Sequence, residues 1–330
     1  MQPRGMVLAV ALGVAAMAGL GAVAYGAEPA VVKVGVLGLM SDAGLYVAME
    51  KGYFQNEGIR VDVERFGSGA KMVPALVAGE LEVAGGTAAA GLFNAIASGS
   101  DFKVVADKGQ VRAGHDFNML VLRKDLLDSG AIRTPAGLRG RKVAHLPGQG
   151  VVSQYLLGRV LEQFGVPWNE VERLDIAAPN QVALMTNKQV DAVVTAEPFG
   201  ARLERAGVGV RYAATAEVMA LERFQPAVFI YSGKFIAGRR DVAKRWMNAY
   251  VRGLRFVHEK GLKSDEVVTI ITKHVRTSAD DIRGSWPPFL PPDGRPDVPS
   301  LAAQQEWYHR MGMVQTQVPM EKVLDLSFLQ

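Results

Sequence analysis

Cysteine is absent from the 330-residue sequence, and histidine occurs only five times. Without cysteine, the chain cannot form a disulfide framework, a thiolate nucleophile, an iron–sulfur cluster or a cysteine-ligated zinc site. The histidines form no HExxH motif, and no two of them have the spacing of a helical ligand pair. The sequence therefore predicts neither a metal site nor a cofactor.

A strong excess of one charge is also lacking. The 37 basic and 33 acidic residues are scattered along the chain, so the sequence predicts no nucleic-acid stripe and no polybasic tail. No GxSxG elbow and no paired nucleophile and base occur, and the GxxxxGK[ST] spacing of a phosphate-binding loop is absent. We therefore expect a protein that is not an enzyme and has no nucleic-acid partner.

The first 27 residues have the pattern of a secretory signal peptide. Arg4 precedes a run from Met6 to Ala24 without a charged or strongly polar residue, and small residues cluster at its end. Cleavage after Ala24 and cleavage after Gly26 both fit the pattern. An uncleaved membrane anchor is the competing interpretation, but the Ala/Gly-rich run is weakly hydrophobic. A lipid anchor needs a cysteine to acylate, so we expect a soluble periplasmic or secreted protein.

After this leader, strand and helix patterns alternate. Strands are predicted at 31–37, 60–66, 81–87 and 102–106, with helices at 43–51 and 70–78. In the middle of the chain, strands are predicted at 142–146, 172–177 and 190–195, again with helices between them. Corresponding strands begin at 33, 61 and 82 and at 142, 172 and 191, which indicates one βαβ architecture used twice. The alternative is that any α/β chain looks self-similar at this level.

Local signals support several of these boundaries. Gly52 and Gly79 stand where helices end, and Lys188 takes the position of Gly79 in the second half. Ser278 and Asp281 form a capping-box pattern. Extended runs at 118–123 and 226–231 are predicted to cross between the lobes, and the helices predicted at 241–260, 263–275, 278–286 and 300–311 are expected to pack on the first lobe.

Nine segments along the mature chain carry a family resemblance. They are Val34–Leu37, Ala48–Phe54, Glu57–Gly58, Gly67–Ala70, Ala75–Val83, Arg123–Asp125, Leu138–Val143, Val190–Ala192 and Glu197–Phe199. In this order they resemble the NMT1/THI5-like, or SsuA-type sulfonate-binding, substrate-binding proteins of ABC importers. The resemblance implies a type II periplasmic binding fold, in which two doubly wound α/β lobes joined by two crossover strands clamp a ligand.

The resemblance also implies partners and a domain plan. A monomeric periplasmic protein would deliver a small molecule to a membrane permease with its ATPase. The domain plan is a signal peptide at 1–27, the first part of lobe 1 at 28–118, lobe 2 at 119–225 and the completion of lobe 1 at 226–330.

The ligand site is expected at the carboxyl ends of the strands, where ligands bind in open α/β sheets. Glycines and helix N-termini in these loops favour an anionic group. The candidate ligand-binding residues are Met40, Ser41, Asp42, Gly67, Ser68, Gly86, Thr87, Lys108, Asn118, Gly148, Gln149, Gly150, Ser153 and Glu197.

Two acidic residues among these candidates leave the chemical class of the ligand undecided. If Asp42 and Glu197 faced the ligand, they would suit N–H donors such as an amine or an aminopyrimidine. Asp42 can instead be a helix N-cap, and Glu197 can be a structural carboxylate. A sulfonate, a carboxylate and an N-heterocycle therefore all remain candidates. A ligand sensor and an exported enzyme on the same fold are the alternative functions, although the pyrimidine-synthesising relatives use cysteine, which is absent here.

Overall fold

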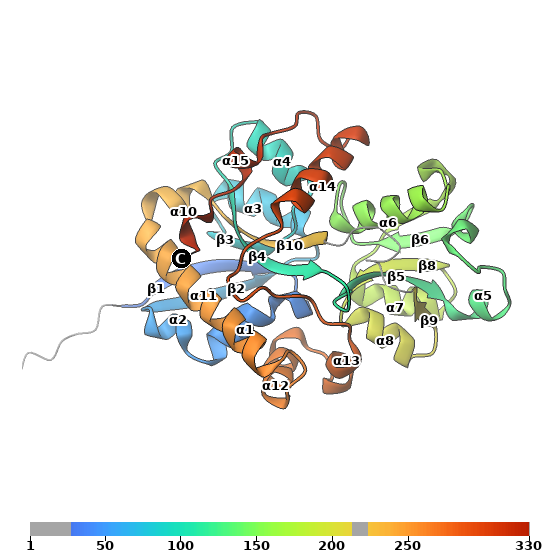
Figure 1. Cartoon of the computed structure of the whole chain (residues 1–330), viewed down its shortest axis with the longest axis horizontal. Helices are drawn as coiled ribbons and strands as arrows, with labels where there is room; N and C mark the ends of the chain where they lie inside the picture. The colour runs from blue at the N-terminus through green and yellow to red at the C-terminus, as the bar shows by residue number, and fades with distance from the viewer. Residues whose placement is uncertain (1–27, 213–223, 330) are drawn as a thin grey trace, which may run out of the picture.

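The computed structural model describes residues 28–212 and 224–329, and it shows two α/β lobes side by side (Figure 1). The expected signal peptide at 1–27 lies outside these residues. Among the helices within the described ranges, none is long and apolar enough to cross a membrane.

The first lobe is built on a five-stranded sheet in the order β2-β1-β3-β10-β4. Its strands are β1 (Ala30–Val36), β2 (Ile59–Arg65), β3 (Val83–Gly86), β4 (Lys103–Val111) and β10 (Phe224–Tyr231). β1 pairs in parallel with β2 and β3, whereas β10 runs antiparallel to β3 and β4. β3 and β10 are buried along their whole length, because helices cover both faces of the sheet.

The second lobe repeats this plan in the order β7-β6-β8-β5-β9. Its strands are β5 (Asn118–Arg123), β6 (Lys142–His145), β7 (Glu172–Asp175), β8 (Ala192–Ala196) and β9 (Gly209–Arg211). β6 pairs in parallel with β7 and β8, and β5 runs antiparallel to β8 and β9. The two sheets therefore correspond strand by strand, and the prediction of one architecture used twice is confirmed.

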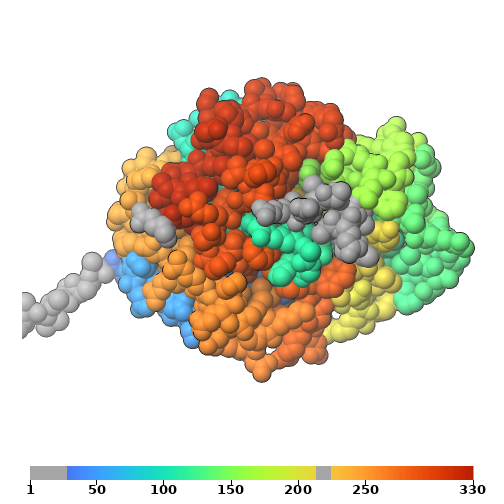
Figure 2. Space-filling model, viewed as in Figure 1, coloured from blue at the N-terminus to red at the C-terminus, as the bar shows by residue number. Residues whose placement is uncertain are grey.

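Helices from both ends of the chain cover the first sheet. The N-terminal set is the 3-10 helix η1 (Met40–Asp42), α1 (Ala43–Glu50), α2 (Tyr53–Asn56), η2 (Gly69–Lys71), α3 (Met72–Ala78) and α4 (Ala90–Ala97). The C-terminal set is α10 (Gly233–Gly238), α11 (Arg240–Lys260), α12 (Asp265–Val275), α13 (Ala279–Gly284), α14 (Val298–Arg310), α15 (Met320–Val323) and η5 (Leu326–Phe328). The amphipathic helix α11 packs its apolar stripe against α1. In Figure 2, the orange and red C-terminal elements cover most of the visible face of this lobe.

The helices and 3-10 turns of the second lobe are α5 (Lys124–Asp128), η3 (Pro135–Leu138), α6 (Val152–Gln163), η4 (Trp168–Glu170), α7 (Ala178–Thr186) and α8 (Phe199–Arg205). Several of them contact the first lobe, among them η4, whose Trp168 ring lies 6.0 Å from the ring of Trp307 in α14. α6 lies against α14, and α8 lies against α13, on opposite sides of the waist between the lobes (Figure 1).

Three of the predicted helix boundaries are confirmed: two left-handed helix ends and one capping box. Gly79 caps α3 with a φ of 78°, and Lys188 adopts the same left-handed conformation with a φ of 55°. The capping box of Ser278 and Asp281 is present at the start of α13. The helix predicted at 278–286 ends earlier, because Ser285 has an extended backbone. The strand predicted at 102–106 continues to Val111, since it pairs with β10 along this length.

Candidate functional site

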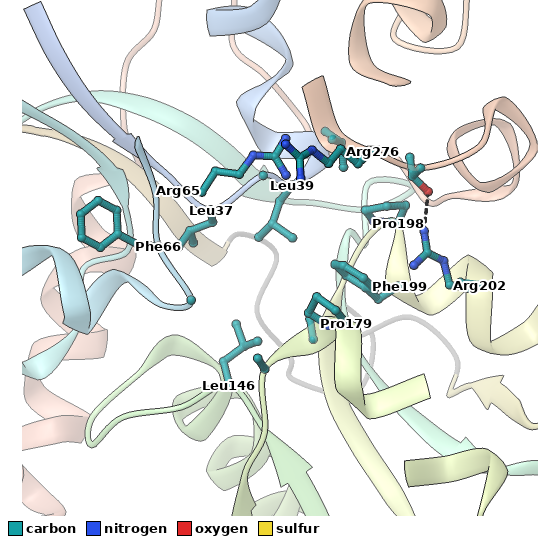
Figure 3. Close-up of a pocket in the computed structure, with 16 residues that line it drawn as sticks. Leu37, Leu39, Arg65, Phe66, Leu146, Pro179, Pro198, Phe199, Arg202 and Arg276 are labelled. Carbon is teal, nitrogen blue, oxygen red and sulfur yellow. Dashed lines mark hydrogen bonds between the residues drawn. The ribbon is translucent and has the colours of Figure 1, made fainter. Parts of the chain in front are cut away.

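A cavity of about 440 Å³ lies between the two lobes, where strand ends of both sheets face each other (Figure 3). The first lobe contributes the chain that follows β1 and β2 and the end of α12. The second lobe contributes the chain that follows β6, β7 and β8. The lining residues are Leu37, Gly38, Leu39, Arg65, Phe66, Gly67, Leu146, Ala177, Ala178, Pro179, Pro198, Phe199, Arg202, Val275, Arg276 and Thr277. The position agrees with the rule that ligands bind at the carboxyl ends of strands in α/β sheets.

Most of the cavity wall is apolar. Leu37 and Leu39 line it from the first lobe, and Leu146, Pro179 and Phe199 line it from the second (Figure 3). Ligand sites for small organic molecules usually combine such walls with a few polar groups, and the volume lies in their usual range of roughly 300–1,000 Å³.

Among the described residues, the charged groups on the lining are three arginines, and no Asp or Glu of the described ranges lines the cavity. Arg65 is the last residue of β2, and Arg276 follows the last turn of α12. Figure 3 shows their side chains extending toward each other on one side of the cavity. Within residues 28–212 and 224–329, neither guanidinium makes a hydrogen bond or an ion pair. Two unneutralised cations at an apolar cavity favour an anionic ligand.

Arg202, the third arginine, connects the two lobes. Its guanidinium donates a hydrogen bond of 2.8 Å to the Thr277 hydroxyl, drawn as a dashed line in Figure 3. It also forms an ion pair of 3.4 Å with the buried carboxylate of Asp281. Arg202 is therefore held by the first lobe, while its own helix α8 belongs to the second.

The candidates Ser41, Asp42 and Lys108 meet in a buried network inside the first lobe. The Lys108 ammonium lies 2.8 Å from the Asp42 carboxylate and donates a hydrogen bond of 2.9 Å to the Ser41 hydroxyl. The backbone N–H of Leu39 donates to the other Asp42 oxygen. Asp42 precedes α1, but its side chain makes no capping hydrogen bond there. Its carboxylate is thus neutralised within the lobe, and the phenol pKa of neighbouring Tyr46 is raised by burial and by Asp42.

A second group of candidates forms where loops of the two lobes touch. The N–H of Ala90 donates a hydrogen bond of 2.8 Å to the carbonyl of Gly150. A side chain on Gly148 would meet the methyl group of Ala70 at 3.2 Å, so glycine permits this approach. The hydroxyl groups of Ser68 and Thr87 are buried and have no hydrogen-bond partner within the described parts of the chain.

The other candidates are dispersed. Met40 is buried in η1, and its N–H lies 3.3 Å from the carbonyl of Glu197 in the other lobe. Ser153 accepts a hydrogen bond from the N–H of Leu146. Gly86 ends β3, Asn118 begins β5 in a buried position, and Gln149 is exposed on its loop. Gly67 is the one candidate on the cavity lining.

Glu197 is buried, and both its carboxylate oxygens are occupied. One oxygen accepts from the Arg211 guanidinium at 2.6 Å and from the N–H of Trp286 at 2.9 Å. The other accepts from the N–H of Ala201 at 2.9 Å. Burial raises the pKa of this carboxyl, and these three donors act in the opposite direction. The arrangement is that of a structural carboxylate, which ties α8 and β9 to the loop after α13.

The cavity arginines were not among the residues predicted from the sequence. Arg65 is the penultimate residue of the strand predicted at 60–66, so the strand-end rule could have found it. Arg276 follows a predicted helix on an element far from the loops considered, and nothing local in the sequence places it at the cavity.

Comparisons with known proteins agree with this architecture. Many solved structures share the fold, and three of them follow. The alkanesulfonate-binding protein SsuA from Xanthomonas axonopodis pv. citri bound to MOPS is 16% identical, with a TM-score of 0.70 over 92% of this chain and 99% of that one. The periplasmic nitrate-binding protein NrtA from Synechocystis PCC 6803 is 16% identical, with a TM-score of 0.72 over 91% and 87%. The desulfurization enzyme DSZB is 15% identical, with a TM-score of 0.64 over 91% and 97%.

A comparison with curated proteins found no significant match. The sequence model of the NMT1-like family matches residues 25–272, which is most of the chain. The two-lobed architecture is the type II periplasmic binding fold expected from the sequence. The chain belongs to the NMT1-like family.

Proposed function

We propose that the protein is the periplasmic substrate-binding protein of an ABC importer, which captures a small organic anion between its lobes. Membership of the NMT1-like family and the shared fold with SsuA and NrtA support this proposal. The observation that carries it is the cavity between the strand ends of the two sheets, with an apolar wall and the guanidinium groups of Arg65 and Arg276, which have no ion-pair partner among the described residues. A cavity of this kind suits a solute that has an apolar body and an anionic group.

The cargo follows from the charges at the cavity. Asp42 and Glu197 would suit a cationic or N–H-bearing solute, but Lys108 and Arg211 neutralise them, and neither acid lines the cavity. The arginines on the lining instead suit a sulfonate or a carboxylate. Among the three cargo classes open at the sequence level, the geometry supports the anions best.

Some of the predicted ligand-binding residues lie outside the cavity lining, where loops of the two lobes meet. The hydroxyl groups of Ser68 and Thr87, which have no hydrogen-bond partner in the part of the chain that the structure describes, lie beside the contact of the Gly148–Gly150 loop with the first lobe. In the proposal, the lobes move apart to admit the solute and close over it when it binds, and these hydroxyl groups are candidate contacts of the solute. The segments 28–118 and 226–330 act as one lobe and 119–225 as the other, apart from Asn118 in β5 and Phe224 and Gln225 in β10, which belong to the opposite sheets.

The partners are proposals as well. A membrane permease with its ATPase would accept the solute from a monomeric binding protein, and residues 1–27 would direct the chain to the periplasm. Deletion of residues 1–27, followed by cell fractionation, tests this part. Retention of the truncated protein in the cytoplasm is the expected result, and unchanged periplasmic export contradicts it.

A thermal-shift screen followed by calorimetry tests the binding function. A ligand at 100 times its Kd stabilises the folded state by about 2.7 kcal/mol, which is a measurable shift. Sulfonates and carboxylates with apolar groups are expected to shift the melting temperature, while amines and aminopyrimidines are not. Because DSZB shares the fold, the bound compound is then analysed by mass spectrometry after prolonged incubation. Recovery of the intact compound is expected, and product formation contradicts the proposal.

A further inference from the structure

We propose that Arg65 and Arg276 form a two-guanidinium clamp that selects solutes with a single oxyanion group on a bulky apolar body. This inference rests on the solute-binding function proposed above and names its substrate class. The clamp consists of residues from two distant parts of the chain, and Arg276 lies beyond residues 25–272, which the family model matches.

The backbone at Arg276 has a conformation that favours glycine over arginine. Arg276 caps α12 in the left-handed conformation, with a φ of 56° and a ψ of 51°. Glycine is the residue usually found at such a position, because a Cβ atom is unfavourable there. An arginine at this position costs stability relative to glycine, and it makes no hydrogen bond or ion pair within the described ranges that would offset this cost. Its side chain lines the cavity instead.

The residues around Arg65 also leave space for its guanidinium group. The group lies over Gly38, which has a φ of 70°, and a Cβ atom at this glycine would come within 3.2 Å of the Arg65 Nη1 atom. Glycine therefore leaves the space in which the Arg65 head group reaches the cavity. Because Gly38 and Leu39 follow β1, the position is set by two adjacent strands of the same sheet.

The charge at the clamp lacks a counterion among the lining residues that the structure describes. Arg202 is the third cation, but Thr277 and Asp281 occupy it. Arg65 and Arg276 extend toward each other in Figure 3 without a carboxylate from the lining. Two like charges at an apolar wall repel each other, and an oxyanion between them removes this repulsion while it accepts from both guanidinium forks.

The remainder of the cavity sets the shape of the solute. Leu37, Leu39, Leu146, Pro179 and Phe199 provide apolar surface, and the volume of about 440 Å³ is far larger than an inorganic anion needs. An aryl or branched alkyl sulfonate or carboxylate satisfies both ends of the site, because its body covers the apolar wall. Inorganic sulfate leaves this wall in contact with water.

Calorimetry with a matched pair of probes tests the clamp. Naphthalene-1-sulfonate and naphthalene-1-sulfonamide share the ring system and differ in charge at pH 7. We expect the sulfonate to bind the wild-type protein at least about 10-fold more tightly than the sulfonamide, since charge-assisted hydrogen bonds are lost in the neutral compound. Inorganic sulfate is expected to bind more weakly than the naphthalene sulfonate.

Variants of the two arginines separate the clamp from a structural role. Arg65→Gln and Arg276→Gly are each expected to weaken sulfonate binding by about 10-fold and to leave sulfonamide binding unchanged. Arg276→Gly is also expected to raise the melting temperature of the ligand-free protein, because glycine suits the left-handed backbone. Arg60→Gln, at the other end of β2, is the control and is expected to change neither affinity.

Several outcomes overturn the inference. Equal affinity for the two naphthalene compounds, or wild-type sulfonate affinity in both arginine variants, removes the clamp and leaves the binding function standing. Preferential binding of an uncharged or cationic solute has the same consequence. If no charged or uncharged compound of the screen binds the wild-type protein, the binding function itself falls, and the clamp falls with it.

Discussion

The two contacts between the lobes differ in chemistry. On one side, α6 packs against α14 through aromatic rings, and on the other side, α8 meets α13 through arginines and acids. The first contact belongs to a hydrophobic cluster that continues into both lobes. The second borders the cavity, since Arg202 and Thr277 belong to both.

In the aromatic contact, Trp307 of α14 is almost completely buried against α6. Its ring lies 5.4 Å from that of Tyr155, and its indole N–H donates to Glu162 at 2.9 Å. A Cβ atom on Gly158 would come within 2.1 Å of the indole ring, so α6 has glycine where the ring packs. Separation of these surfaces would expose a large aromatic area to water.

In the polar contact, Asp281 pairs with Arg205 at 2.8 Å and with Arg202 at 3.4 Å. The guanidinium of Arg211 donates to the carbonyl of Gly284 and stacks over the ring of Trp286 at 4.3 Å. Most of these partners can exchange their hydrogen bonds for water at little cost when the contact opens. The comparison therefore indicates a pivot at the aromatic contact and an opening at the polar contact, which gives solutes access to the cavity.

The largest effect on stability is expected from a substitution at the aromatic contact. Trp307→Ala should lower the free energy of unfolding by about 3–5 kcal/mol, because it leaves a cavity at the centre of the aromatic contact. Chemical denaturation measures this loss. Trp168→Ala, which removes a half-buried ring of the same cluster, is the matched control and should cost less. Similar losses in the two variants would argue against Trp307 as the centre of the pivot.

The second-largest effect is expected from a substitution of the buried carboxylate of Glu197. Glu197→Gln replaces an ionised acceptor of three donors by an amide, and we expect a loss of about 2 kcal/mol in the free energy of unfolding. The sulfonate affinity of the folded variant should stay within about twofold of wild type, because the carboxylate does not line the cavity. A large loss of sulfonate affinity without a loss of stability would indicate that Glu197 contacts the ligand.

A substitution of Asp281 tests whether the polar contact between the lobes opens. Asp281→Asn keeps a side chain able to cap α13 but removes the charge that holds Arg202 and Arg205. The closed state should lose about 1 kcal/mol, which weakens solute binding about fivefold in calorimetry. Asp265→Asn removes the exposed ion pair with Arg283 and is the control. Equal effects of the two substitutions would show that the polar contact does not contribute to closure.

The smallest effect concerns pH. Burial acts to raise the pKa of Asp281, but Thr277, Ser278, Arg202 and Arg205 together hold it below its ordinary value. The contribution of this carboxylate is therefore complete above the unfolded-state pKa and is lost as the pH falls through the lowered pKa. A sulfonate ligand remains ionised, so calorimetry should show weaker binding below about pH 4 in the wild type. A profile of Asp281→Asn that falls as steeply as the wild-type profile contradicts this assignment.

Local sequence signals were sufficient for much of the fold. The parallel βαβ units, the left-handed ends at Gly79 and Lys188 and the capping box of Ser278 all depend on residues close together in the chain. Helix α4 was not predicted, because it is rich in Ala and Gly and begins after Ala89, which has no capping side chain. Strand β9 has three residues, too few to show a pattern.

The site was harder to predict because its chemistry depends on distant pairs. Asp42 carries no local sign that Lys108 neutralises it, and Glu197 is bonded to the N–H of Trp286, which lies 89 residues further along the chain. Gly67, which the strand-end rule selected, lies on the cavity lining, but the arginines that give the cavity its charge come from a strand end and a helix end.

Distances between spin labels test the central claim, that the lobes close over a solute at the polar contact while the aromatic contact stays fixed. Since the sequence has no cysteine, labels can be attached at introduced cysteines alone. Asn180→Cys with Asp280→Cys spans the polar contact, and Gln163→Cys with Glu306→Cys spans the aromatic contact. Addition of naphthalene-1-sulfonate should shorten and narrow the first distance distribution and leave the second unchanged. Equal changes in both distributions, or no change in the first, would contradict the account.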